Sequence, residues 1–370
     1  MSPHNQISLN RGPRSWLAAL VTTLLLATAL PGRSATAAPE ISGYFKRFQD
    51  GSRTEPLFLN VKTSEGMHAF RFEHTARHGE ETREEHFVGV SRRPSTSGSL
   101  HKASLSIFGT RGFLYFHSRR RGRPHAVEFT LERSTLAPQL TKVAITSIPK
   151  GFLSCAVEAT ESGAHALQSV QVAHHHKGPK QGVIPVRILE VAAEADYAFF
   201  RRFGSETRNY IRSSLRAADV LYTSELGIRI KLTSLRVNNR DSRKTSILSA
   251  EGLLESFRQQ STPRRVAADV HHLFTGSTLD GVTIGIAYVG TACLEQGRYN
   301  VGVSKAVNRA LQPVLAAHEI AHNLSAVHDE GRSSVMNPAP RSSGASFSSK
   351  SRKDIRSFIE LAGSCLSLPG

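Results

Sequence analysis

Residues 318–329 read HEIAHNLSAVHD and contain three histidines and one glutamate. Its first two histidines, His318 and His322, are four residues apart, which places both imidazoles on one face of a helix about one turn apart. A third histidine, His328, follows close behind. Neutral imidazoles are typical zinc ligands, and three protein ligands leave one coordination position open, as in catalytic rather than structural zinc sites. The stretch therefore predicts one catalytic Zn²⁺ ion held by these three histidines.

Glu319 follows the first histidine, and its carboxylate can approach a water molecule bound to the same metal ion. There it accepts the water proton and passes it to a leaving amine, while the metal stabilises the oxyanion. Two alternatives are a helix that carries two histidines by chance and a structural Cys/His site. Histidine makes up 17 of the 370 residues, so a third one at this distance rarely arises by chance, and no cysteine lies near.

The stretch resembles the metzincin zinc signature HExxHxxGxxH, and Asp329 directly after the third histidine is similar to the reprolysin (adamalysin or ADAM-like) branch. The motif SVMNP at 334–338 resembles the Met-turn of that family, which implies that Met336 lies beneath the zinc site. Three further segments are similar to reprolysin sequence: 269–276, 285–293 and 347–351. The resemblance spans roughly residues 183–366 and implies a zinc-dependent endopeptidase that hydrolyses peptide bonds of protein or peptide substrates.

One residue departs from the family pattern, because Ser325 stands where the signature has glycine. The resemblance implies that the chain turns sharply there, which suits a positive φ. A residue other than glycine in that conformation costs roughly 1–2 kcal/mol. We expect a folded domain to tolerate this strain, and we expect it to loosen the geometry of His328 rather than to remove a group that the chemistry needs.

The chain has three cysteines, and the resemblance implies that Cys293 pairs with Cys365. Cys155 is then left over. In ADAM-like zymogens a prodomain cysteine occupies the open zinc position, and residues 149–155 (PKGFLSC) resemble such a switch, although the spacing from Pro-Lys is longer. A thiolate is a good zinc ligand, so Cys155 is a candidate zinc ligand of a latent state. A free, buried structural cysteine is the plainer alternative.

Residues 1–38 have the features of a signal peptide, with an arginine-containing start, an apolar run at 16–30 and small residues around 35–38. An uncleaved membrane anchor is the alternative, although the run is shorter than the ~20 residues that span a bilayer. We therefore expect a zymogen that is secreted or extracellular, or periplasmic in a Gram-negative source, with no stable membrane insertion after signal cleavage. Export would also allow a disulfide bond.

The rest of the chain divides by composition. Residues 39–173 contain short alternating runs and predict a β-rich, propeptide-like domain, and 174–182 (HHHKGPKQG) predict an exposed linker. Residues 183–370 alternate strand and helix patterns, which predicts an α+β fold. The resemblance implies a three-layer zincin domain with a mixed, mostly parallel sheet.

The expected helices are 205–223, 250–260, 311–324 and 351–361, the last with Ser351 as N-cap. The expected strands are 184–191, 227–237, 267–274 and 282–289. By resemblance, 285–290 forms the edge strand that binds substrate; an ordinary core strand is the alternative.

The chain is basic, with 47 Lys and Arg against 30 Asp and Glu and a formal net charge of +17. No nucleic-acid-binding motif accompanies this charge, so we expect no nucleic-acid partner, while electrostatic attraction to anionic surfaces fits the charge. A second function remains open: a secreted binding or adhesion protein whose protease domain is weak or vestigial. The intact zinc residues argue against that alternative, and Ser325 keeps it open.

Overall fold

The computed structural model describes residues 40–44, 57–63, 66–76, 84–91, 102–117, 124–131, 140–146, 154–158, 186–240, 249–261, 267–293, 299–329, 334–339 and 346–369. The predicted signal peptide and linker lie outside these residues. None of the described helices has both the length and the apolar character needed to cross a membrane. Helices and two sheets are present, one of them mixed and the other N-terminal, which confirms the predicted α+β class.

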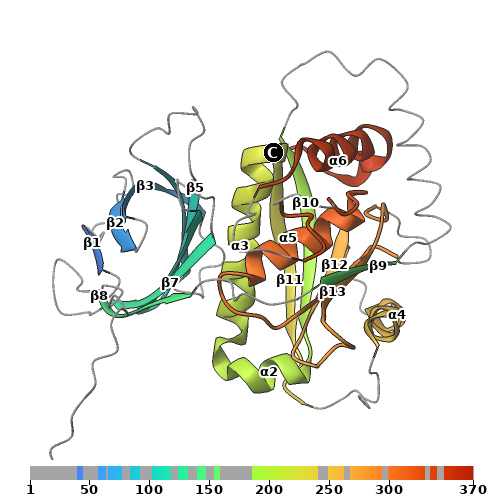
Figure 1. Ribbon diagram of the computed structural model, residues 1–370, viewed down its shortest axis with the longest axis horizontal. Helices are drawn as coiled ribbons and strands as arrows, with labels where there is room; N and C mark the ends of the chain where they lie inside the picture. Colours follow the sequence, from blue (N-terminus) through green and yellow to red (C-terminus); the bar gives the residue numbers. More distant parts are fainter. Residues whose placement is uncertain are drawn as a thin grey trace, which may run out of the picture. The chain divides into compact units, whose positions relative to one another are not determined.

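The N-terminal part is an eight-stranded antiparallel sheet in which each strand pairs with the next along the chain (Figure 1). Alternate residues point to one side and form a buried apolar cluster that includes Phe70, Phe72, Leu105, Leu114 and Phe116. This confirms a β-rich N-terminal region. The strands are β1 (Glu40–Tyr44), β2 (Leu57–Thr63), β3 (Gly66–Ala76), β4 (Glu84–Ser91), β5 (Lys102–Phe108), β6 (Arg111–His117), β7 (Pro124–Leu131) and β8 (Leu140–Thr146).

The second sheet has six strands in the order β11-β10-β12-β14-β13-β9. Strands β10, β11, β12 and β14 run parallel, whereas β13 pairs antiparallel with β14. Strand β9 comes from the N-terminal half of the sequence and pairs in parallel with β13. The predicted boundary between the two parts lies outside the described residues and stays a prediction. The bounds are β9 (Ser154–Glu158), β10 (Arg187–Ala195), β11 (Ile228–Val237), β12 (Val270–Thr275), β13 (Thr283–Tyr288) and β14 (Val301–Lys305).

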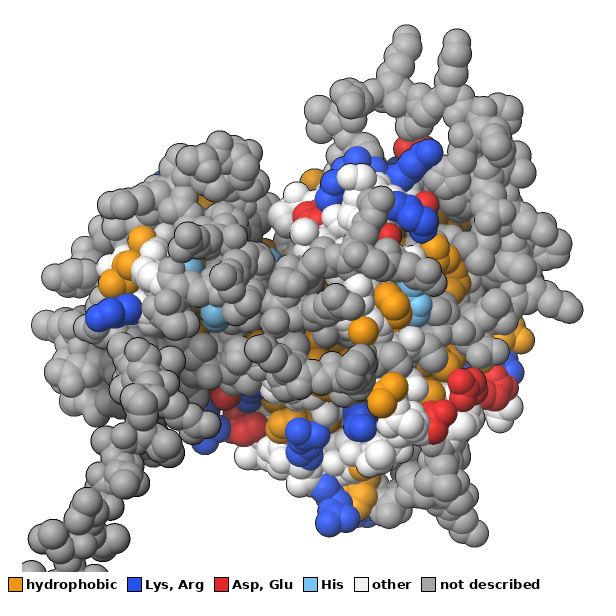
Figure 2. All heavy atoms as spheres, in the orientation of Figure 1, with side chains coloured by type: hydrophobic (Ala, Val, Ile, Leu, Met, Phe, Trp, Pro, Cys, Tyr) orange, Lys and Arg blue, Asp and Glu red, His pale blue; other side chains and the backbone are white. Residues whose placement is uncertain are grey.

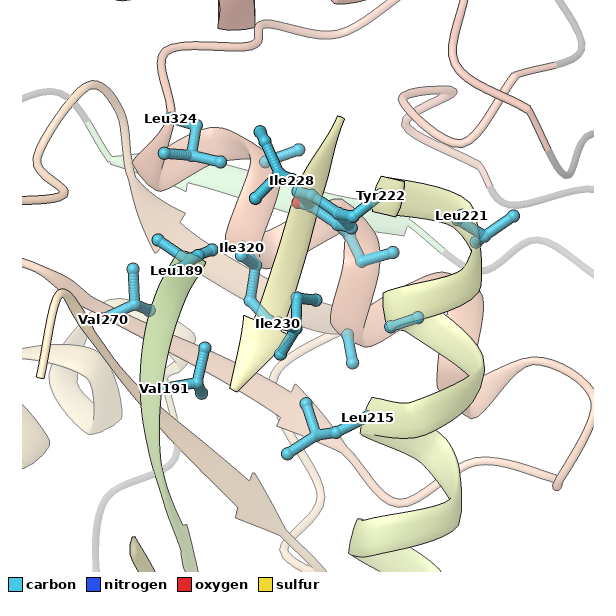
Figure 3. Close-up of a cluster of buried hydrophobic side chains, with 14 of the residues drawn as sticks. Leu189, Val191, Leu215, Leu221, Tyr222, Ile228, Ile230, Val270, Ile320 and Leu324 are labelled. Atoms are coloured by element: carbon cyan, nitrogen blue, oxygen red, sulfur yellow. The ribbon is translucent and has the colours of Figure 1, made fainter. Parts of the chain in front are cut away.

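Helices cover both faces of this sheet and produce three layers. On one face, α3 (Thr207–Leu226), α5 (Gln312–Asn323) and α6 (Ser349–Ala362) share a large apolar cluster with the strands, and Figure 3 shows Leu189 and Val191 of β10 among its members near Ile320 of α5. On the other face, α4 (Ala250–Ser261) packs Leu254 and Phe257 against β12, β13 and β14. The short helix α2 (Tyr197–Phe203) precedes α3, and 3-10 turns occupy Gly204–Glu206 and Gly363–Cys365.

All four predicted helices and all four predicted strands of this part are present, with shifted ends. The predicted N-cap was wrong. Ser348, in extended conformation, accepts the hydrogen bond from the backbone N–H of Ser351, so α6 begins earlier and Ser351 lies within its first turn. Two short elements were missed, α2 and β14. The side chain of Asp196 caps α2 through the N–H of Phe199, a signal visible in the sequence.

Candidate active site

Helix α5 carries the first two predicted ligands, and every residue of this helix is buried. Pro313 lies in its first turn, where the missing N–H removes no helical hydrogen bond. The hydroxyl of Tyr222 on α3 donates to the carbonyl oxygen of Ala317 across 2.8 Å, which fixes the helix one residue before His318. The histidines are therefore held by a rigid, buried element rather than by a surface loop.

Backbone carbonyls determine how the two imidazoles of α5 are turned. Nδ1 of His318 lies 2.7 Å from the oxygen of Val335, and Nδ1 of His322 lies 2.7 Å from the oxygen of Ala326. A carbonyl oxygen only accepts, so each Nδ1 carries the proton and each Nε2 carries a lone pair. The two Nε2 atoms are 3.0 Å apart, and Nε2 of His328 lies 3.2 Å from both.

This donor set fits a zinc ion. Nitrogen ligands at 2.0–2.1 Å around tetrahedral zinc would lie about 3.3 Å apart, close to the spacing of the three Nε2 atoms. Two lone pairs that face each other at 3.0 Å repel unless a cation lies between them. Burial, with a smaller effect of His328, lowers the pKa of His318 to about 3, and burial lowers the pKa of His322 as well. Both imidazoles are therefore neutral, and the three histidines can hold a metal ion.

The third histidine reaches the site through a turn at Ser325. Ser325 has a φ of 73°, as expected where the signature has glycine, and its N–H donates to the carbonyl oxygen of His322 across 2.8 Å. Its hydroxyl is buried and makes no hydrogen bond within the described part of the chain. The turn that His328 needs is thus made by a residue that is strained in it.

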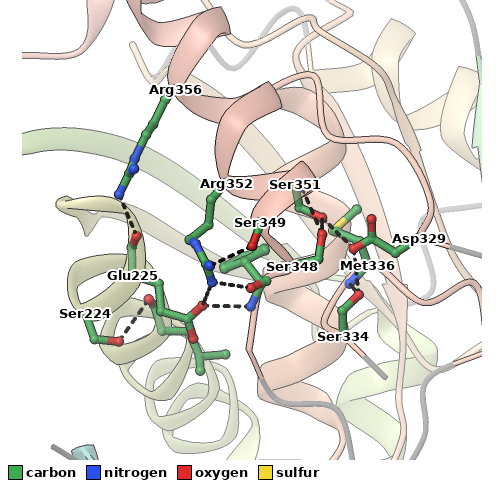
Figure 4. Close-up of polar contacts among 12 residues, drawn as sticks. Ser224, Glu225, Asp329, Ser334, Met336, Ser348, Ser349, Ser351, Arg352 and Arg356 are labelled. Atoms are coloured by element: carbon green, nitrogen blue, oxygen red, sulfur yellow. Dashed lines mark hydrogen bonds and ion pairs between the residues drawn. The ribbon is translucent and has the colours of Figure 1, made fainter. Parts of the chain in front are cut away.

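A small polar network anchors the residue after His328 (Figure 4). Oδ2 of Asp329 accepts hydrogen bonds from the hydroxyls of Ser334 at 2.7 Å and Ser351 at 2.6 Å. The backbone N–H of Asp329 donates to the carbonyl oxygen of Met336 at 2.8 Å. Burial raises the pKa of Asp329, but the hydroxyl groups outweigh burial and leave it lowered. Met336 itself is fully buried in the apolar cluster that α3, α5 and α6 share with the sheet. The carboxylate therefore joins the ligand loop to the Met336 segment and to α6.

Glu319 and Cys155 meet at the same place. A ligand atom from each of Cys155, His318 and Glu319 lies within 4.8 Å of the others. Burial raises the pKa of the Glu319 carboxyl. Burial also raises the pKa of the Cys155 thiol, and the nearby Glu319 raises it further. Both predicted groups therefore lie beside the histidine cluster, in surroundings that exclude water.

Strand β9 brings Cys155 to this position. Cys155 pairs with Gly285 of β13, and its N–H donates to the carbonyl oxygen of Pro338 across 2.8 Å. The strand is thus flanked by β13 on one side and by the chain just after Met336 on the other. An extended peptide already occupies the edge of the sheet next to the site.

The structure also contains the predicted disulfide bond between Cys293 and Cys365, and Cys155 is free and buried. Sequence reasoning missed three contributions: the hydroxyls of Ser334 and Ser351 on Asp329, and the close approach of Gly285 to Glu319. Ser334 and Ser351 belong to the segments that resemble reprolysins, but no spacing rule connects them with Asp329. Gly285 had a usable signal, because glycine inside a strand often marks a close approach.

Comparison with known families agrees with this geometry. Residues 186–359 match a reprolysin model described as metallo-peptidase family M12. The matched range contains the three histidines, Glu319, Asp329 and Met336, and M12 metallopeptidases are zinc-dependent. The part of the chain from 186 to 359 therefore belongs to the reprolysin-type metzincins and is a metallopeptidase domain.

Proposed function

We propose that this chain is a secreted zinc endopeptidase in which His318, His322 and His328 hold one catalytic Zn²⁺ ion and Glu319 is the general base. The observation that carries the proposal is the convergence of three Nε2 atoms within 3.0–3.2 Å of one another beside a buried carboxylate. A zinc ion bound there would polarise the scissile carbonyl and increase the acidity of a bound water molecule.

The protein groups divide the remaining work. The carboxylate of Glu319 takes the proton of the attacking water and returns it to the leaving amine. The edge of β13 holds an extended peptide by main-chain hydrogen bonds, as it holds β9. The carbonyls of Val335 and Ala326 keep the imidazoles oriented, because they accept the Nδ1 protons.

The test compares the purified protein, cut within residues 174–182, with its Glu319→Ala variant treated in the same way. We expect one zinc ion per chain, cleavage of a protein substrate that stops with a chelator, and loss of cleavage in the variant. Glu251→Ala, an exposed glutamate on α4, is the matched control and retains activity. Cleavage unchanged in Glu319→Ala would refute the mechanism, and an inactive wild type without zinc would favour the binding or adhesion protein.

We further propose that the N-terminal half is a propeptide and that Cys155 is a zinc ligand in the latent precursor. The pairing of β9 with β13 and the proximity of the Cys155 thiol to His318 and Glu319 support this role. A thiolate at the open position would exclude water from the metal. The strand also covers the edge where we expect substrate to bind.

The latency proposal predicts that a Cys155→Ala precursor cleaves substrate before any cut in residues 174–182. The control is the double variant Cys155→Ala with Glu319→Ala. We expect it to cleave no substrate, which would show that the new activity comes from this site. If Cys155→Ala is as latent as the parent, the thiol is a buried structural group and the switch is excluded.

Export and surface attraction are further proposals. The disulfide between Cys293 and Cys365 is typical of an oxidising compartment. Figure 2 shows Lys and Arg side chains gathered over α6, where Lys350, Lys353 and Arg356 are exposed. Such a patch fits attraction to anionic polymers. Retention on a sulfated polysaccharide column that weakens with added salt would support it, and retention unchanged by salt would contradict it.

A further inference from the structure

The geometry points to Gly285 as a positioning residue for the carboxylate of Glu319, a role that rests on the proposed function of Glu319 as the base. Gly285 lies in the middle of β13 and is buried. A β-carbon placed on Gly285 would lie 2.1 Å from Oε1 of Glu319, 2.7 Å from its Cδ and 3.0 Å from its Cγ. These distances are well below the optimal separation of about 3.5–4.0 Å between carbon atoms. The carboxylate therefore occupies the space that any other residue at 285 would fill.

Backbone conformation does not explain a glycine at this position. The described glycines with positive φ do not include Gly285. Glycine inside a strand weakens the strand, because it has no side chain to pack and loses more conformational freedom on folding. The feature that requires glycine here is the approach of the Glu319 side chain from α5.

The consequence is a defined shift of the base. With alanine at 285, Oε1 of Glu319 would have to retreat by about 1 Å, and misplacement of that size in an active site can cost about 100-fold in rate. The Nε2 atoms of His318, His322 and His328 are not among the atoms nearest to the added β-carbon. Zinc binding is therefore preserved while the proton transfer suffers.

The kinetic test uses the full chain with Cys155→Ala, so that the thiol does not compete with substrate. Gly285→Ala is expected to lower kcat about 100-fold, with KM and zinc content within about threefold of the parent. The matched control is Gly302→Ala on the neighbouring strand β14, where the nearest atom to an added β-carbon is Cβ of Ala287 at 3.3 Å. The control retains kcat within about threefold, since no atom has to move far.

Rescue separates positioning from general damage. Glu319→Asp shortens the side chain by one methylene and withdraws the carboxylate from β13. On its own it lowers kcat, but in the Gly285→Ala chain it is expected to cost much less, because the overlap has gone. Equal losses from Glu319→Asp in both chains, or a Gly285→Ala chain with the kcat of its parent, would overturn the role.

A third measurement needs neither zinc nor activity. Gly285→Ala is expected to lower the midpoint of urea unfolding in the parent, but in a Glu319→Ala chain it lowers the midpoint no more than Gly302→Ala does. If the parent binds no zinc and cleaves no substrate, the proposed function fails. The comparison of unfolding midpoints still tests whether Gly285 accommodates the Glu319 side chain. The same midpoint loss with and without the Glu319 side chain would show that Gly285 does not accommodate the carboxylate.

Discussion

The hydroxyl of Ser351 donates a 2.6 Å hydrogen bond to Oδ2 of Asp329, so the first turn of α6 holds the residue that follows the third histidine (Figure 4). The two residues are 22 positions apart in the sequence. Oδ2 of Asp329 also accepts a hydrogen bond from the hydroxyl of Ser334, so one carboxylate oxygen connects the loop that carries His328 to two other segments. The position of His328 therefore depends on the docking of α6.

Ser351→Ala is expected to lower zinc affinity about tenfold, because groups that orient a ligand from the outer shell typically contribute 10–100-fold. Competition with a chromogenic chelator measures the change. Ser349→Ala, an exposed serine two residues earlier on the same helix, is the control and keeps the parental affinity. Equal zinc retention in both variants would show that Asp329 holds the loop without this bond.

Ser325→Gly is expected to raise the free energy of unfolding by about 1–2 kcal/mol. The variant relieves the strain of a φ of 73° and removes a buried hydroxyl without a described partner. Glycine also makes the unfolded chain more flexible, which lowers the free energy of unfolding by roughly 0.4–1 kcal/mol. The two gains exceed this loss. Urea unfolding measures the difference.

Ser325→Ala separates the two contributions, because it removes the hydroxyl and keeps the β-carbon in the strained conformation. It is expected to gain less than Ser325→Gly. A glycine variant that is less stable than the parent would mean that the turn tolerates serine without strain.

The proposed zinc ligands and base could be predicted from the sequence because the spacing of most of them is a property of a single helix. His318, Glu319 and His322 need only the 3.6-residue period of α5. His328 was assigned from its place six residues after His322. The longer helices and most strands of the second half were also predictable, because their apolar periods are regular, whereas the short elements α2 and β14 were missed. The β-rich character of the N-terminal half followed from its alternating runs.

Contacts between distant segments could not be read in this way. The bond between Ser351 and Asp329, and the overlap between Gly285 and Glu319, depend on how separate elements pack. The N-cap of α6 was misplaced because three serines, at 348, 349 and 351, are equally good capping residues by type. Only the extended backbone of Ser348 identifies the one that caps.

Removal of the disulfide by Cys293→Ala and Cys365→Ala is expected to lower the free energy of unfolding by about 4 kcal/mol in the chain-entropy model. The bond closes a loop between residues 72 apart in the sequence and ties the chain after β13 to the end of α6. Urea unfolding of the double variant against the parent measures the loss. Cys155→Ala, which removes the free cysteine, is the control, and an equal loss there would contradict the assignment.

Glu225, at the end of α3, gives the domain a pH-dependent stability. Its carboxylate accepts a 2.7 Å hydrogen bond from the N–H of Phe347 and lies 3.6 Å from Arg352, yet burial outweighs both and raises its pKa from 4.5 to about 7. Between these values the unfolded chain releases this proton while the folded chain keeps it. Stability from this group is therefore complete below pH 4.5, falls as the pH rises to about 7, and then stays level.

Glu225→Gln keeps an oxygen that can accept the bond from Phe347 and removes the titration. Urea unfolding between pH 5 and pH 8 is expected to show the parent losing up to about 3 kcal/mol relative to this variant, since one pKa unit corresponds to about 1.4 kcal/mol. Glu360→Gln, an exposed glutamate on α6, is the control and follows the parent across the range. Parallel pH profiles for the parent and Glu225→Gln would mean that Arg352 and Phe347 hold the carboxylate ionised despite its burial.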